Sequence, residues 1–313
     1  MPDIPFWNKC DNRCLMCANA PSFARGPSGR YHLKPQVKRF ESYLAGFSGA
    51  YARNADNRAA LNLTGGEPTL HPEFLKLLAY FRKKTSGREL ALLSNGRRFA
   101  DRAFAGAALR IAKPPFSVAV PLHGSTHAGH DAVTGVGGSF EASLAGLRNI
   151  FAEKRPGQVL EIRLVLHRRN IRDLKNTLSF LLGEFSGFKE WRVVALHYEL
   201  EGGALKNSKS LALRLETSAA AVNAAAGLIR KFKEFRLYHF PLCLLKKQLR
   251  PLAWVSLPPE DRTYPASCLF CAAKALCPGL MRRYSESFGQ GRIKALRPER
   301  LLYYNGHIHD GPP

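Results

Sequence analysis

No run of about 18 apolar residues, the minimum for a helix that crosses a membrane, occurs in this 313-residue sequence. The N-terminus, MPDIPFWNKCDNRC, lacks the apolar core of a secretory signal peptide. Internal repeats and low-complexity segments are also missing. Apolar residues make up 45% of the chain and charged residues 23%, which is typical of globular proteins. We therefore expect a folded cytoplasmic protein with no membrane contact, built as one large or two modest domains.

Acidic residues are few. The chain has 24 Asp and Glu against 47 Lys and Arg, which gives a formal net charge of +23. A chain this basic is attracted to polyanions, whether nucleic acid, anionic lipid or an acidic protein. The alternative is a solvated basic surface that serves no partner.

Cysteine is absent from the 225 residues between Cys17 and Cys243. The seven cysteines therefore fall into one group of three and one group of four. An odd number cannot pair completely into disulfides. In a cytosolic enzyme, clustered cysteines are more often metal ligands or catalytic groups.

The middle of the chain alternates between strand-like and helix-like patterns. Apolar residues at helical spacing occur over 74–81, 140–151 and 174–185. Short apolar runs predict strands at Ala59–Leu63, Leu90–Leu93, Ser117–Leu122, Val159–Leu166, Trp191–Leu196 and Arg236–Phe240. This order predicts an α/β fold with a parallel sheet, closed or partly closed. From Cys243 onward the pattern breaks into Pro-rich loops that carry cysteines, so we place a boundary near 235 and predict two domains, 1–234 and 235–313.

The first cysteine group, Cys10, Cys14 and Cys17, has the spacing C-x3-C-x2-C after a short N-terminal strand. Fully ligated [4Fe–4S] clusters use four cysteines, so three thiolates would leave one iron with an open position. A zinc site is the alternative, because zinc also takes clustered cysteines. Structural zinc requires four ligands, however, and His32 is the nearby histidine.

A second motif, Gly65-Gly66-Glu67-Pro68, follows the predicted strand at 59–63. Two glycines allow a ligand to approach the backbone closely. Glu67 stands at the carboxyl end of a strand, which is the edge where α/β barrels keep their active sites. Taken alone, this motif is equally compatible with a simple tight turn.

Together the two motifs resemble the radical SAM superfamily over roughly residues 4–200. The resemblance implies a partial (β/α)6 TIM-like barrel with a C-terminal iron–sulfur extension. It also implies an enzyme that reductively cleaves S-adenosyl-L-methionine to a 5′-deoxyadenosyl radical, which abstracts hydrogen from a substrate. Cys10, Cys14 and Cys17 match the ligands of the catalytic [4Fe–4S] cluster, whose open iron would chelate S-adenosylmethionine.

The same resemblance implies several cofactor-binding residues. The turn Gly65, Gly66 and Glu67 matches the one that receives the methionine amino group, and Ser94 with Asn95 matches a segment near the ribose. Arg163 matches a cationic position that meets the methionine carboxylate. Period-2 alternation places Arg163 and Glu161 on one face of their strand, so an ordinary ion pair is the alternative.

Two positions depart from the family pattern. Met16 stands where an aromatic residue often packs on adenine, and a flexible methionine side chain can also cover a purine face. Pro121 stands where many members place a ribose-binding serine. We expect His123 or Ser125 to take over that contact.

The second cysteine group, Cys243, Cys268, Cys271 and Cys277, resembles a reduced form of the auxiliary-cluster extensions called SPASM or twitch domains. Its four thiols would ligate a second [4Fe–4S] cluster completely, and they exclude two auxiliary clusters. A structural zinc site is the alternative. We expect this cluster to accept an electron from oxidised substrate or to anchor the substrate.

Enzymes with such an extension are commonly maturases of ribosomally made peptides, so a peptide or protein is the expected substrate. Several stretches, including Leu63–Leu70, Leu93–Phe99 and 161–168, are similar to the radical SAM maturases of the His-Xaa-Ser peptide system. Nine residues precede Cys10, so we expect any leader-binding partner to be a separate protein. A flavodoxin or ferredoxin would supply electrons. The alternatives are cofactor biosynthesis, RNA modification drawn by phosphate contacts, and a zinc-stabilised nucleic-acid-binding protein without catalysis.

Overall fold

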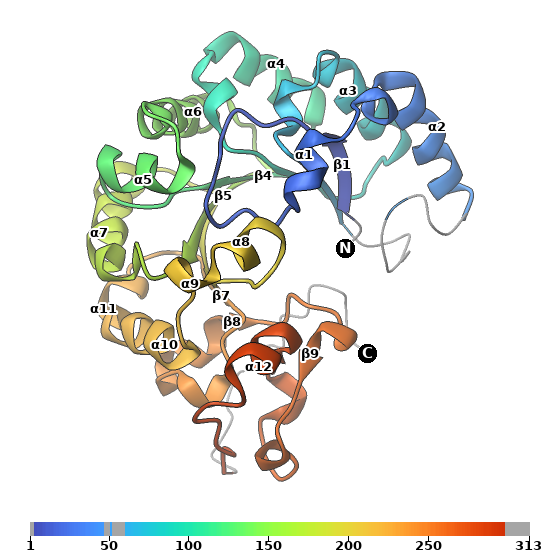
Figure 1. Ribbon diagram of the computed structural model, residues 1–313. Helices are drawn as coiled ribbons and strands as arrows, with labels where there is room; N and C mark the ends of the chain where they lie inside the picture. The colour runs from blue at the N-terminus through green and yellow to red at the C-terminus, as the bar shows by residue number, and fades with distance from the viewer. Residues whose placement is uncertain (1–2, 47–50, 52–59, 298–313) are drawn as a thin grey trace. The chain divides into compact units, whose positions relative to one another are not determined.

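A computed structural model describes residues 3–46, 51 and 60–297 of the chain (Figure 1). The strands are β1 (Asp3–Trp7), β2 (Leu61–Gly65), β3 (Leu90–Leu93), β4 (Phe116–Pro121), β5 (Gln158–Leu166), β6 (Trp191–His197), β7 (Phe235–Tyr238), β8 (Ala253–Trp254), β9 (Arg262–Thr263) and β10 (Leu280–Met281). The helices are α1 (Pro21–Arg25), α2 (Leu33–Leu44), α3 (Phe74–Lys84), α4 (Arg102–Ala112), α5 (His127–Thr134), α6 (Ser139–Glu153), α7 (Leu174–Phe185), α8 (Gly202–Lys206), α9 (Ser208–Leu211), α10 (Leu215–Ala224), α11 (Ala226–Ile229) and α12 (Arg282–Phe288).

Strands β1 to β8 belong to one sheet in which they follow chain order, while β9 and β10 form a separate antiparallel pair. Helices separate the successive strands from β1 to β7. The predicted α/β class with a parallel, partly closed barrel is therefore confirmed. The sheet is longer than the six strands expected, because β7 and β8 add parallel strands after β6.

Two compact units divide the chain. The first unit comprises Met1–Leu122, Thr126–Ile162 and Phe188–Trp191, and the second comprises His123–Ser125, Arg163–Gly187 and Arg192–Pro313. The division falls within β5, so that strand contributes to both units, and it differs from the predicted boundary near 235. The functional division into 1–234 and 235–313 stays a prediction.

In the first unit, β1 to β4 pair in parallel, with Ile4 opposite Leu63 and Leu61 opposite Leu90. Leu61 and Leu63 are fully buried, as expected for a strand covered on its apolar face. Helices α2, α3, α4 and α6 pack each on the next along the outer side (Figure 1). Aromatic rings fill the space beneath them, with the ring centroids of Phe40 and Phe81 3.9 Å apart. This packing fixes the strands whose carboxyl ends carry the motifs.

In the second unit, β6, β7 and β8 pair in parallel, with Leu196 opposite Tyr238 and Tyr238 opposite Trp254. Helices α7 to α11 accompany these strands, and the chain from Leu242 onward contains mainly short 3-10 turns, the β9–β10 pair and α12. No helix among the described residues is long and apolar enough to cross a membrane.

Candidate active site

The first cysteine loop begins where β1 meets the end of β2. The backbone N–H of Gly66 donates to the Trp7 carbonyl at 2.7 Å, and that of Glu67 donates to the Lys9 carbonyl at 2.8 Å. A Cβ on Gly66 would lie 2.4 Å from the Lys9 carbonyl oxygen, and one on Gly65 would lie 2.2 Å from that of Trp7. The two glycines therefore bring the β2 turn against the residues that lead into Cys10.

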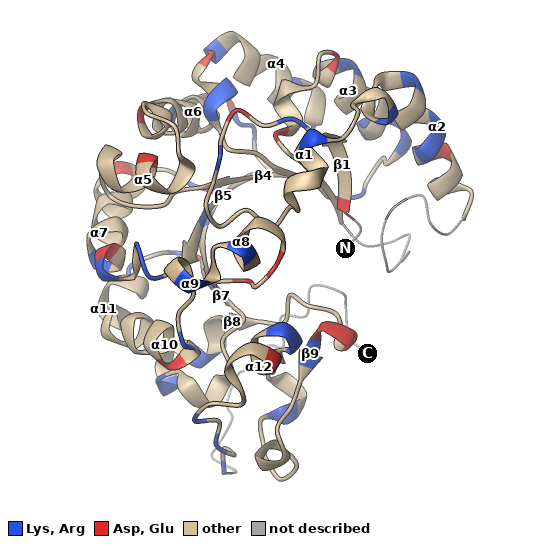
Figure 2. Cartoon of the chain, in the orientation of Figure 1, with Lys and Arg blue, Asp and Glu red and all other residues tan. Residues whose placement is uncertain are grey.

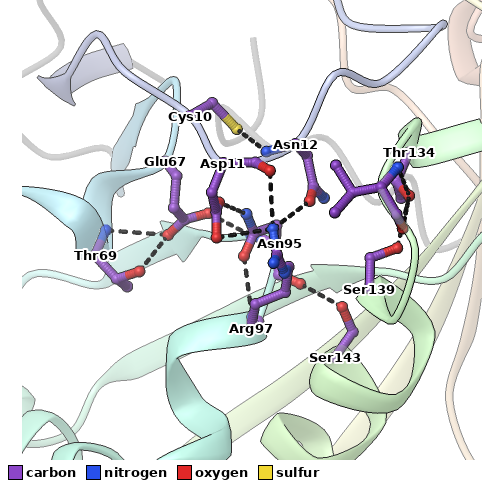
Figure 3. Close-up of polar contacts among 12 residues, drawn as sticks. Cys10, Asp11, Asn12, Glu67, Thr69, Asn95, Arg97, Thr134, Ser139 and Ser143 are labelled. Atoms are coloured by element: carbon purple, nitrogen blue, oxygen red, sulfur yellow. Dashed lines mark hydrogen bonds and ion pairs between the residues drawn. The ribbon is translucent and has the colours of Figure 1, made fainter. Parts of the chain in front are cut away.

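The Glu67 carboxylate is the buried centre of this turn, at 1% exposure. Its Oε1 accepts hydrogen bonds from the Thr69 N–H at 3.0 Å, the Thr69 hydroxyl at 2.6 Å and the Ser94 hydroxyl at 2.8 Å. Its Oε2 accepts from the Asn95 N–H at 2.6 Å (Figure 3). Burial raises the pKa of Glu67, and the hydrogen bonds from Thr69, Asn95 and Ser94 oppose that rise. The carboxylate thus joins the ends of β2 and β3, two segments that the sequence motifs identify separately.

Residues inside the cysteine loop are held by the end of β3. The Asn95 side-chain amide donates to Asp11 Oδ1 at 2.6 Å, and the Arg97 guanidinium forms an ion pair with Asp11 Oδ2 at 2.9 Å (Figure 3). Arg97 also donates to Asn12 Oδ1 at 3.0 Å. Asp11, Asn12 and Arg97 were not among the predicted site residues. The polar residues between Cys10 and Cys14 were the available signal for Asp11 and Asn12, and no local pattern marks Arg97.

The end of α5 holds the other side of the loop. The N–H of Arg13 donates to the Thr134 carbonyl at 2.8 Å, and the N–H of Leu15 donates to the Val133 carbonyl at 3.0 Å. The Arg13 guanidinium also donates to the Gly135 carbonyl at 2.9 Å. These bonds are long-range in sequence and involve no sulfur atom.

The three thiols differ in exposure. Cys10 is exposed, whereas Cys14 and Cys17 are half-buried, as is Met16 beside them. Burial, together with the neighbouring thiols Cys10 and Cys17, raises the pKa of Cys14 to about 12. Ligation to iron must therefore displace a proton from Cys14. A short loop with three thiols and one buried carboxylate turn fits a cluster with three protein ligands.

His123 and Arg163 belong to the second unit. His123 follows β4 and is buried, and Arg163 lies in β5. Burial favours a higher pKa for Glu199, but a hydrogen bond from His239 and the charges of His239 and Arg163 lower it below its usual value. His239 Nε2 lies 2.7 Å from Glu199 Oε1, and the sequence analysis did not identify this pair. The roles of His123, Arg163 and Met16 toward the cofactor stay predictions.

The second cysteine group lines a single cavity in the second unit. All four cysteines border this cavity: Cys243, Cys268, Cys271 and Cys277. Its empty volume is about 350 Å³, which includes space that is open to solvent. Backbone N–H groups point at the sulfur atoms: Leu242 donates to Cys277 Sγ at 3.5 Å and Leu296 to Cys271 Sγ at 3.3 Å. Within 3–46, 51 and 60–297, no group of three or more His, Cys, Asp or Glu side chains is arranged to hold a single metal ion.

Comparison with known families identifies the superfamily of the chain. Residues 4–181, more than half of the chain, match the family described as the Radical SAM superfamily. The chain belongs to the radical SAM superfamily. The family implies a [4Fe–4S] cluster and S-adenosylmethionine, which agrees with the loop at Cys10–Cys17 and the turn at Gly65–Glu67.

Two curated relatives match parts of the chain. Mycofactocin maturase MftC of Mycobacterium tuberculosis is 32% identical over 115 residues, which is 36% of this chain and 27% of the relative. Fe-coproporphyrin III synthase of Methanosarcina barkeri is 30% identical over 173 residues, 55% of this chain and 39% of the relative. The chain therefore spans well under half the length of these relatives.

Solved structures share the radical SAM fold at low sequence identity. Streptococcus suis SuiB bound to precursor peptide SuiA superposes with a TM-score of 0.56 at 14% identity, covering 75% of this chain and 48% of SuiB. Native anSMEcpe with bound AdoMet and Cp18Cys peptide superposes with a TM-score of 0.51 at 16% identity, covering 72% and 58%.

The hydrogen bonds that the Glu67 carboxylate accepts lead to a first testable prediction. A Glu67→Gln substitution replaces one acceptor oxygen by an NH2 group facing N–H or hydroxyl donors, so we expect the free energy of unfolding to fall by about 2 kcal/mol or more. Denaturant titration of the metal-free chain measures this. Glu73→Gln is the matched control, because its partly exposed carboxylate makes a surface pair with Lys76 at 3.1 Å. Equal stability of the two variants would contradict the role given to Glu67.

Proposed function

We propose that the chain is a radical SAM enzyme that oxidatively modifies a ribosomally made peptide or protein. The observation that carries the radical chemistry is the loop Cys10–Cys17, held from one side by the end of β3 and from the other by the end of α5. These contacts hold the three-cysteine loop in place, and the glycine turn packs against the residues that lead into it, with the Gly66 and Glu67 N–H groups donating to the Trp7 and Lys9 carbonyls.

Some of these residues would bind the cluster and the cofactor, and others hold the loop and the turn in place. Cys10, Cys14 and Cys17 would bind three irons, and Gly65, Gly66 and Glu67 would receive the methionine amino group through their backbone. Asp11, Asn95 and Arg97 fix the loop through side-chain contacts, while Glu67 fixes the turn. When bound, the cluster and S-adenosylmethionine supply a 5′-deoxyadenosyl radical that abstracts hydrogen from the substrate. A flavodoxin or ferredoxin would deliver the electron.

A second [4Fe–4S] cluster at Cys243, Cys268, Cys271 and Cys277 is part of this proposal. Four thiols on one cavity with backbone N–H groups directed at two of the sulfur atoms support it, because such hydrogen bonds stabilise thiolates and tune cluster potential. Anaerobic reconstitution should then give about eight irons and eight sulfides per chain, measured by metal and sulfide analysis. About four irons with one tightly bound zinc would contradict the second cluster and leave the first intact.

The peptide substrate is supported by the named activity of the mycofactocin maturase relative. The test uses peptides encoded beside the gene, incubated with the reconstituted chain, S-adenosylmethionine and a reductant. A peptide substrate should raise 5′-deoxyadenosine formation and change mass by loss of hydrogen. If none of the peptides encoded beside the gene changes in mass, the proposal of a peptide substrate is contradicted.

Cofactor biosynthesis is the second candidate, because Fe-coproporphyrin III synthase is also a relative. Under this alternative, iron coproporphyrin III would be formed from an added iron tetrapyrrole precursor in the same assay, while the peptides remain unchanged. Product analysis by mass spectrometry separates the two candidates in one experiment.

A further inference from the structure

The turn between Cys268 and Cys271 carries two strongly exposed apolar side chains. Leu269 is 65% exposed and Phe270 is 92% exposed, whereas Cys268 is buried at 8%. The N–H of Cys271 donates to the Cys268 carbonyl at 3.2 Å, which closes the turn at its base. Among the described residues only two other large apolar side chains, Phe188 and Leu205, are classed as exposed, at 39% and 45%. We call Leu269 and Phe270 the Leu-Phe tip.

The position of the tip ties it to the second cysteine group. Cys268 and Cys271 border the cysteine cavity, and the two tip residues are the chain between them. A protein that binds over the tip therefore contacts the two residues that connect Cys268 to Cys271. No other exposed apolar pair among the described residues is placed in this way.

Basic residues outnumber acidic ones in this cysteine segment. Lys274 lies 5.9 Å from the Tyr264 ring and acts electrostatically on the Cys268 thiol, while Arg250 acts on the Cys243 thiol. Between Cys243 and Arg297 the sequence has ten Lys or Arg and three Asp or Glu residues, and Figure 2 marks both kinds of charged segment around β9 and α12, blue for Lys and Arg and red for Asp and Glu. An exposed aromatic side chain beside charged residues is the usual composition of a protein–protein contact. The excess of basic residues in this segment favours an acidic partner.

We propose that the Leu-Phe tip docks a small acidic one-electron carrier protein of the ferredoxin type, which exchanges electrons with the second cluster. The proposal rests on the proposed function, because it requires that cluster. In the exchange, a reduced [4Fe–4S]1+ cluster gives one electron to the oxidised carrier and returns to the 2+ state. No covalent bond forms or breaks and no proton moves in this step. The exchange removes the electron that substrate oxidation leaves on the cluster.

The test uses the reconstituted full chain and an acidic plant-type [2Fe–2S] ferredoxin as the probe. The wild-type chain should bind the ferredoxin at low salt and lose affinity as ionic strength rises. Phe270→Ala should raise Kd about tenfold, because it removes the exposed ring at the centre of the contact. Lys274→Gln should weaken binding less and reduce its salt dependence. Leu205→Ala is the matched control and should bind like the wild type.

Electron exchange is measured in the same variants by stopped-flow absorbance, once with the ferredoxin reduced first and once with the chain reduced first. The bimolecular rate constant should fall in Phe270→Ala in parallel with affinity. Equal Kd or equal rate constants for wild type and Phe270→Ala, or no binding at low salt, would overturn the docking proposal. Iron and zinc analysis of each variant is read separately, because zinc in place of the second cluster contradicts the proposed function and not the docking surface.

Discussion

Cys14→Ala should reduce 5′-deoxyadenosine formation to the level of a blank without enzyme. Cys14 is the central thiol of the first loop, and a cluster left with Cys10 and Cys17 would lack one of its three protein ligands. Without an intact cluster there is no open iron site to chelate S-adenosylmethionine. The measurement is the amount of 5′-deoxyadenosine released from S-adenosylmethionine with dithionite as reductant and no substrate.

Cys271→Ala is the matched control for this result, because it removes one thiol from the other group. It should keep the absorbance of the first cluster and form 5′-deoxyadenosine in the absence of substrate. Soluble yield is compared as well, since ligation at Cys271 contributes to the stability of a loop-rich segment. Normal 5′-deoxyadenosine formation by Cys14→Ala would refute the assignment of the first loop.

Gly66→Ala has the second large expected effect. Its Cβ would lie 2.4 Å from the Lys9 carbonyl oxygen and 2.9 Å from that of Asn8, which are backbone atoms that cannot move aside cheaply. The substitution should push the β2 turn away from the entry to the cysteine loop, lower the free energy of unfolding by about 3 kcal/mol, and prevent loading of the first cluster. Thermal unfolding of the metal-free chain and iron content after reconstitution measure the two effects.

Gly183→Ala provides the comparison for Gly66→Ala. Gly183 lies in α7, and a Cβ there would meet no heavy atom within 4 Å. Alanine is the better helix former by about 1 kcal/mol, so this variant should be at least as stable as the wild type. If Gly66→Ala matched Gly183→Ala in stability and iron content, the close approach at the β2 turn would have no role in folding or in loading of the first cluster.

The elements that sequence predicts well are those whose signal is local. The run at Leu90–Leu93 matches β3 in full, and Trp191–Leu196 falls one residue short of β6. Both are apolar strands buried by tertiary packing, so composition alone marks them. Strand β2 runs from Leu61 to Gly65, later than the predicted Ala59–Leu63, because the glycine turn still pairs with β1; Ala59 lies outside the described residues.

The elements that sequence cannot predict depend on contacts between distant segments. Asp11 and Arg97 are 86 residues apart along the chain, and no local pattern identifies them as an ion pair. Glu199 and His239 are 40 residues apart along the chain, and each follows a different strand of the sheet. The division inside β5 also depends on packing, whereas the predicted boundary near 235 follows a change in composition.

Backbone bonds from Arg13 and Leu15 to Thr134 and Val133 hold the first cysteine loop through contacts that do not involve its thiols. The conformational entropy of ordering this loop is lost when the protein folds, so metal insertion begins from a preorganised cradle. In both cysteine groups a backbone N–H also donates to a thiol: Asn12 donates to Cys10 Sγ in the first, and Leu242 and Leu296 donate to Cys277 Sγ and Cys271 Sγ in the second. After oxidative loss of the first cluster, we expect it to be rebuilt in place, because the bonds from Arg13 and Leu15 to α5 do not involve the thiols.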